Sequence, residues 1–141
     1  MIQRIQTVYL VLGAVALVSL LFFSGLWNGA SSEAQAWFTP AVFGIGGLAA
    51  VVALVAVFLF KDRPRQRKVI VAAQILTVLH LLVFYLGLFL AGALYIRTAR
   101  GLNVEMLVAL LLPLVAYLLF FLARRSVEKD IELVRSMDRL R

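Results

Sequence analysis

The chain has 141 residues, of which 64% are apolar and only 15% are charged, whereas an average soluble domain is about 45–50% apolar and about 25% charged. A soluble fold of this length would leave large apolar patches exposed, so the composition predicts a membrane protein. The sequence contains no cysteine, which excludes disulfides, thiolate metal sites and cysteine nucleophiles. The formal charge of +7 does not favour nucleic-acid binding, because the basic residues lie at the ends of apolar segments.

Four apolar stretches, at about residues 5–26, 41–60, 69–94 and 104–123, are each long enough to cross a hydrocarbon core as a helix. They are continuously apolar and lack the alternation of a barrel strand, so the predicted fold is all-α. The connections between them are short, which favours antiparallel neighbours. We therefore expect one integral membrane domain over residues 1–141, an up-down bundle of four transmembrane helices followed by a cytoplasmic amphipathic helix at 124–141.

The first stretch also resembles a secretory signal peptide, because Arg4 precedes it and an A-x-A cleavage pattern follows at Ala34–Ala36. However, the apolar run at residues 5–26 is longer than the roughly 7–15 residues of a signal peptide, and it ends well before that pattern. We expect the segment to remain as the first helix.

The basic residues predict the orientation of the helices. Of the 14 Lys and Arg residues, only Arg97 and Arg100 lie in the two connections on the expected outer side. The others lie near the amino terminus, in the loop Lys61–Lys68 and after residue 123. By the positive-inside rule we expect both termini of this multi-pass protein to be cytoplasmic, with its helices in contact with membrane lipids.

Small and polar residues mark the expected packing faces. In the second stretch, residues at helical intervals are small, which allows a neighbouring backbone to approach: Gly46, Ala49, Ala50, Ala53 and Ala56. In the third stretch, Thr77 and His80 share a face with Ala73, Phe84 and Gly87. In the fourth, Pro113 removes one backbone donor and predicts a kink.

His80 is the one ionisable side chain near the middle of a predicted span, and such residues are functional candidates by default. With Gln74 and Thr77 it forms the intramembrane polar set. The simplest interpretation is that a neutral His80 hydrogen-bonds a neighbouring helix, with Tyr117, Ser19 or a backbone carbonyl as partner. Haem or metal ligation requires a second ligand, and the chain has no other His and no Cys. We therefore expect no metal or cofactor within one chain.

The segment after residue 123 lacks Gly and Pro and places Val127, Ile131, Val134 and Met137 on one stripe of a helix. Acidic residues are mixed into its polar face, whereas a helix that binds only lipid favours Lys and Arg there. The pattern favours contact with protein, within the chain or between chains.

Two terminal motifs carry a resemblance to a known family. The segments Met1–Tyr9 (MIQRIQTVY) and Glu132–Arg141 (ELVRSMDRLR) resemble the opening and closing motifs of a small four-span membrane family of Bacteroidota, domain of unknown function 4293. The resemblance implies an inner-membrane location in a Gram-negative host and supplies no catalytic residue. Its motifs lie on the expected cytoplasmic side, where Gln/Arg/Asp hydrogen bonds would join the two ends of the chain. The residues assigned to this contact surface are Arg4, Arg135, Asp138, Arg139 and Arg141.

Three functions remain open from the sequence. The first is a non-enzymatic accessory or scaffold subunit, which acts through helix packing, contacts with other membrane subunits or a second copy, and its cytoplasmic tail. The second is a small transporter or lipid-handling protein that uses the His80 face and the Pro113 kink. The third, a haem-binding electron-transfer subunit, would need an axial ligand from a partner chain.

Overall fold

The computed structural model of the chain describes residues 2–23, 36–94, 96–98 and 101–139. Four long helices make up most of this part: α1 (Ile2–Ser19), α3 (Phe38–Phe58), α4 (Arg63–Leu90) and α5 (Val104–Arg139). A short 3₁₀ helix, η1 (Leu20–Phe22), continues α1. Two-residue strands β1 (Arg97–Thr98) and β2 (Gly101–Leu102) pair antiparallel before α5, with Arg97 opposite Leu102.

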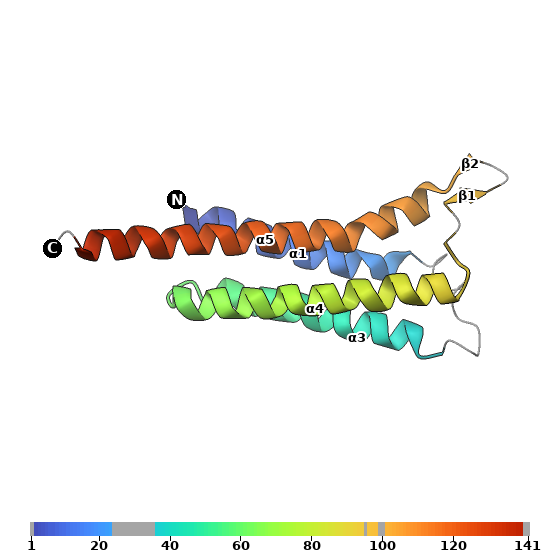
Figure 1. Cartoon of the computed structure of the whole chain (residues 1–141), viewed down its shortest axis with the longest axis horizontal. Coiled ribbons are helices and arrows are strands. Elements are labelled where there is room, and N and C mark those ends of the chain that lie inside the picture. The colour runs from blue at the N-terminus through green and yellow to red at the C-terminus, as the bar shows by residue number, and fades with distance from the viewer. Residues whose placement is uncertain (1, 24–35, 95, 99–100, 140–141) are drawn as a thin grey trace.

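The four helices form an up-down bundle in which α1 packs on α3 and α5, and α4 packs on the same two helices (Figure 1). Each is long and apolar enough to cross a membrane. The chain is therefore an all-α, multi-pass membrane protein. Both termini and the turn between α3 and α4 lie at one end of the bundle, which we call the terminal end, and β1 and β2 lie at the other (Figure 1).

The helix bounds follow from capping residues rather than from the limits of the uncharged stretches. α4 begins at Arg63, not near residue 69, because the Asp62 side chain accepts a hydrogen bond from the backbone N–H of Arg65 and Pro64 occupies the first turn. It ends at Leu90, since Gly92 adopts φ +62° and the N–H of Ala93 bonds back to the Leu88 carbonyl.

The fourth span and the expected cytoplasmic helix are one continuous helix, α5. Asn103 caps its start by accepting from the N–H of Met106 at 3.1 Å. Beyond residue 123 no Gly or Pro interrupts the helix, so it continues to Arg139. Its amino-terminal part, which contains Pro113, is inclined to the remainder (Figure 1), as expected of proline within a helix. The structure describes the first span as far as Phe23. The remaining residues of the predicted stretch, 24–26, lie outside the described part of the chain.

Small residues form the centre of the bundle. The predicted stripe of the second span is buried as expected, with Gly46, Ala49, Ala50, Ala53 and Ala56 all facing the interior of the bundle. Large side chains fill the space that these residues leave, including Leu10 of α1, Ile70 of α4 and Phe120 of α5. Aliphatic residues on the outer faces, such as Ile75 and Leu118, are exposed, which suits contact with lipid.

Candidate functional site

His80 of α4 lies sealed against α3, with a side chain that is 1% exposed. Its Nδ1 is 3.1 Å from the carbonyl oxygen of Val42, and a carbonyl only accepts, so Nδ1 is the donor. The ring approaches α3 this closely because position 46 is glycine, where a Cβ atom would lie 2.8 Å from His80 Cε1. Of the partners expected for His80, the backbone carbonyl is therefore the one observed.

Aromatic rings continue from His80 along the α3–α4 interface. Phe84 stacks on the imidazole with centroids 6.0 Å apart and planes 6° apart, and Phe38 stacks on Phe84 at 6.4 Å. Gly87 leaves room for the Phe38 ring, which a Cβ atom there would strike. Phe84 on one face and the hydrogen bond to Val42 together hold the imidazole in one orientation.

The other imidazole nitrogen, Nε2, is buried and has no hydrogen-bond partner among the described residues. Beside His80 lies a cavity of about 30 Å³, which by volume holds about one water molecule. Its other lining side chains are apolar, including Leu17, Leu21 and Phe43, so a water there would find few of the two to four polar partners that buried water requires. The part of the chain that the structure describes contains no group of three metal-ligating side chains.

Thr77 and Gln74, the other members of the intramembrane polar set, do not join His80. The Thr77 hydroxyl donates to the carbonyl of Ala73 at 2.8 Å, within its own helix. Gln74 faces α5 instead, where its Oε1 accepts from Nη1 of Arg124 at 3.3 Å. The polar set thus divides between the α3–α4 interface and the α4–α5 interface.

Four helices meet in a polar network at the terminal end of the bundle. Gln6 of α1 donates through Nε2 to the carboxylate of Asp130 on α5 at 2.8 Å, and both side chains are buried. Arg63 of α4 donates to the Asp130 carbonyl at 3.3 Å. Gln66, also of α4, donates to the Ala56 carbonyl near the end of α3 at 3.0 Å. Amides and carbonyls therefore supply most of the buried links.

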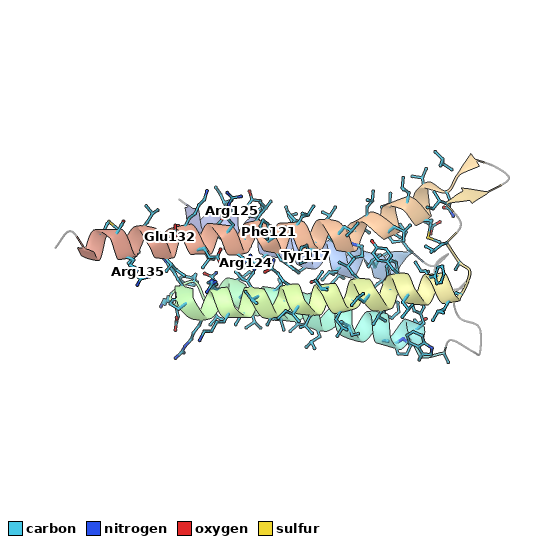
Figure 2. All side chains as sticks on the ribbon, viewed as in Figure 1. Tyr117, Phe121, Arg124, Arg125, Glu132 and Arg135 are labelled. Carbon is cyan, nitrogen blue, oxygen red and sulfur yellow. The ribbon has the colours of Figure 1, made fainter. Side chains whose placement is uncertain are left out.

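Ion pairs cover the α4–α5 side of this network. The guanidinium of Arg67 lies 2.8 Å from a carboxylate oxygen of Glu128, and the same oxygen is 3.7 Å from Nε of Arg124. One carboxylate thus faces two guanidinium groups. Arg124 also lies over the ring of Phe121, with 5.3 Å between Cζ and the ring centroid. Figure 2 shows Arg124 and Tyr117 on the side of α5 that faces α4.

The contact surface expected at the two ends of the chain is described in part. The amino-terminal helix and the tail do meet, through Gln6 and Asp130. Of the residues assigned to that surface, Arg135 is exposed (Figure 2). The side chains of Arg4, Asp138 and Arg139 lie outside the described part of the structure, as does Arg141, so their role stays a prediction.

Sequence reasoning did not single out Arg124, Gln66 or Asp130 as network members. Gln66 and Arg124 lie beside the ends of apolar stretches and Asp130 lies in the predicted tail helix, and polar residues at such positions are usually expected to be solvated. One signal was present, because Asp130 and Gln66 occupy the apolar face of their own helices, as Ile131 and Ile70 on neighbouring positions indicate.

Comparison with known families gives one match. The family model described as Domain of unknown function (DUF4293) matches residues 26–140. The chain belongs to this family. No curated protein and no solved structure matches the chain.

The family match covers most of what is described above. Residues 26–140 include the closing motif up to residue 140, His80 with its ring column, and the α4–α5 ion pairs, but not the opening motif Met1–Tyr9. The part of the chain that the DUF4293 model matches therefore includes all of α3, α4 and α5. The Gln6–Asp130 bond joins this part to α1.

Proposed function

We propose that this DUF4293 protein is a non-enzymatic accessory or scaffold subunit of the bacterial inner membrane that acts through its tail. The observation that carries the proposal is the length of α5, which extends past the ends of the other helices at the terminal end (Figure 1). On this extension Leu133, Val134 and Met137 are 53%, 42% and 62% exposed. An apolar stripe held outside the bundle suits a protein partner.

A groove lies where the extension leaves the bundle. It measures about 550 Å³ and is lined by Phe60, Lys61, Arg63 and Pro64 from the α3–α4 turn and by Ile131 and Val134 from α5. The groove combines apolar side chains with the two basic residues Lys61 and Arg63. Together with the exposed stripe it supports a docking surface for the cytoplasmic segment of another membrane subunit or of a second copy.

The basic residues support a cytoplasmic position for this end. Four helices bring both termini to the same side, and the same end carries the basic segment Lys61–Lys68, which spans the α3–α4 turn and the first turns of α4 (Figure 1). The positive-inside rule then favours the cytoplasm for the terminal end. The alternative function, a transporter that uses the His80 face, requires a polar cavity that reaches the imidazole. The cavity beside His80 is about 30 Å³ with apolar side chains around it, so the geometry favours the contact role.

The proposal is tested by site-specific photo-crosslinking in native membranes. A photoreactive residue at Met137 is expected to give a discrete adduct with one partner or with a second copy. The matched control is Leu118, which is also exposed on α5 but within the apolar part. If Met137 and Leu133 give no protein adduct and the chain is recovered as a lone monomer, the contact role is wrong.

A further inference from the structure

A groove between α4 and α5 opens on the lipid-facing side of the bundle, one level deeper than the Arg67–Glu128 ion pair. Its volume is about 240 Å³, and it is lined by Val71, Gln74, Ile75 and Val78 of α4 and by Tyr117 and Arg124 of α5. Neither the proposed tail function nor the His80 column uses it. Gln74 and Arg124 lie at the same level of the groove, and Val78 and Tyr117 lie further from the terminal end.

The unsatisfied polar atoms at this groove are hydrogen-bond donors. Gln74 is 5% exposed, and its Oε1 accepts from Arg124, so its remaining amide atom is Nε2, an N–H donor. Nε2 has no partner among the described residues. Nε of Arg124 is likewise buried without an acceptor, since the nearest carboxylate oxygen, on Glu128, is 3.7 Å away. Both atoms are covered by their neighbours, but the Arg124 side chain as a whole is 32% exposed and lines the groove, so a ligand with acceptor oxygens meets the exposed part of this side chain.

The charge at the groove is positive. Glu128 is the carboxylate beside Arg124, and it lies closer to Arg67, at 2.8 Å, than to Arg124. One negative charge thus faces two positive charges. Phe121 holds the Arg124 guanidinium from below through its ring, so the cation is positioned without a full counter-ion. An anion at Arg124 would balance the second positive charge.

The depth of the groove identifies the class of anion. Arg124 follows the apolar part of α5 directly, so it lies where the hydrocarbon meets the headgroups. Further along α4, away from the terminal end, Ile75 and Val78 are 64% and 42% exposed and form an aliphatic wall. A phosphate at Arg124 and an acyl chain along Ile75 and Val78 have the same order as the parts of a phospholipid.

We propose that the groove between α4 and α5 is a binding site for one anionic phospholipid of the leaflet that faces the chain termini, with Arg124 as the donor to its phosphate oxygens and Gln74 holding Arg124 in place through Oε1. Such a charge-assisted hydrogen bond is stronger than one between neutral groups, because the donor is ionised and the surroundings have a low dielectric constant. This proposal depends on the membrane location and not on the tail function, so either can fail alone.

The test is native mass spectrometry of the purified full chain with two lipids of equal acyl composition, phosphatidylglycerol and phosphatidylcholine. One phosphatidylglycerol per chain is expected to be retained, with about tenfold preference over phosphatidylcholine, because both lipids offer a phosphate but the choline cation would lie beside the surplus positive charge of Arg67 and Arg124. Arg124→Gln is expected to reduce this retention about tenfold. The matched control is Arg125→Gln, which removes the same charge from an exposed neighbour that does not line the groove.

A second variant separates loss of the site from loss of the fold. Gln74→Glu supplies Arg124 with a carboxylate from within the chain, so the bundle keeps its packing while the need for an external anion disappears. Retention of phosphatidylglycerol is expected to fall about tenfold in this variant. The proposal is overturned if Gln74→Glu retains the lipid like the wild type, if Arg125→Gln has the same effect as Arg124→Gln, or if the two lipids are retained equally. It is also overturned if inorganic phosphate in place of lipid occupies the site and displaces phosphatidylglycerol.

Discussion

The close approach of α3 to α4 at Gly46 makes a sharp prediction for the substitution Gly46→Ala. An added Cβ would lie 2.8 Å from Cε1 and 2.9 Å from Nδ1 of His80, closer than real Cβ atoms approach such neighbours. The imidazole has little freedom to move, since Phe84 stacks on it and Val42 accepts its N–H. Overpacking of this kind costs about 1–3 kcal/mol in the free energy of unfolding.

The matched control is Gly44→Ala, on the same helix. A Cβ there meets nothing within 4 Å, so this variant gains the helix propensity of alanine, about 1 kcal/mol, without a clash. The propensity gain is common to both variants and cancels in their difference. We therefore expect Gly46→Ala to be less stable than Gly44→Ala by about 1–3 kcal/mol, measured by steric trapping or by titration with a denaturing detergent.

A double-mutant cycle assigns the cost to His80. In a His80→Ala background the clash has no partner, so the difference between Gly46→Ala and Gly44→Ala is expected to disappear. If the two glycine variants differ by less than about 0.5 kcal/mol in the wild-type background, or if the same difference persists without the imidazole, the described contact does not limit the helix separation and the reasoning fails.

Three further predictions concern the hydrogen bonds and the topology. Gln6→Ala leaves the buried Asp130 carboxylate without its donor and is expected to lower the free energy of unfolding by about 1–3 kcal/mol in the same assay; an effect near zero would contradict the described bond. Tyr85→Phe removes a 2.6 Å bond to the Leu110 carbonyl and is expected to cost only about 0.6 kcal/mol, the average for bonds between membrane helices, so a loss above about 2 kcal/mol would show another role for Tyr85. Reporter fusions at positions 65 and 141 are expected to report the cytoplasm and those at positions 31 and 97 the outside, and the reverse pattern would refute the proposed orientation.

The packing faces were accessible from the sequence because they depend on local spacing. Small residues such as Gly46 and Ala53 recur every three or four positions. This spacing places them on one face of the helix, and that face is buried against neighbouring helices. The face of α4 that contains Thr77, His80 and Phe84 was predicted in the same way and is buried. Helical periodicity alone defines which residues share a face.

The helix ends were harder to predict from the sequence, because the length of an apolar stretch and the length of a helix are set by different interactions. Lipid contact sets the length of an apolar stretch, whereas capping sets the end of a helix. Asp62 and Pro64 start α4 well before the charged residues end, and Gly92 stops it before the apolar stretch does. Both signals are visible in the sequence once a helix is allowed to continue into the headgroup region.

The sequence by itself determined that this chain has four segments long and apolar enough to cross a membrane as helices, since continuous apolar runs without charge are unfavourable in water. It also determined which faces of the helices are small or polar. Only the tertiary structure decided the partners of the polar groups: His80 with the Val42 carbonyl, Gln74 with Arg124, and Gln6 with Asp130. Helical spacing defines the direction of a side chain but not the rotation and height of the helix opposite, so hydrogen bonds between helices arise only when the whole bundle packs.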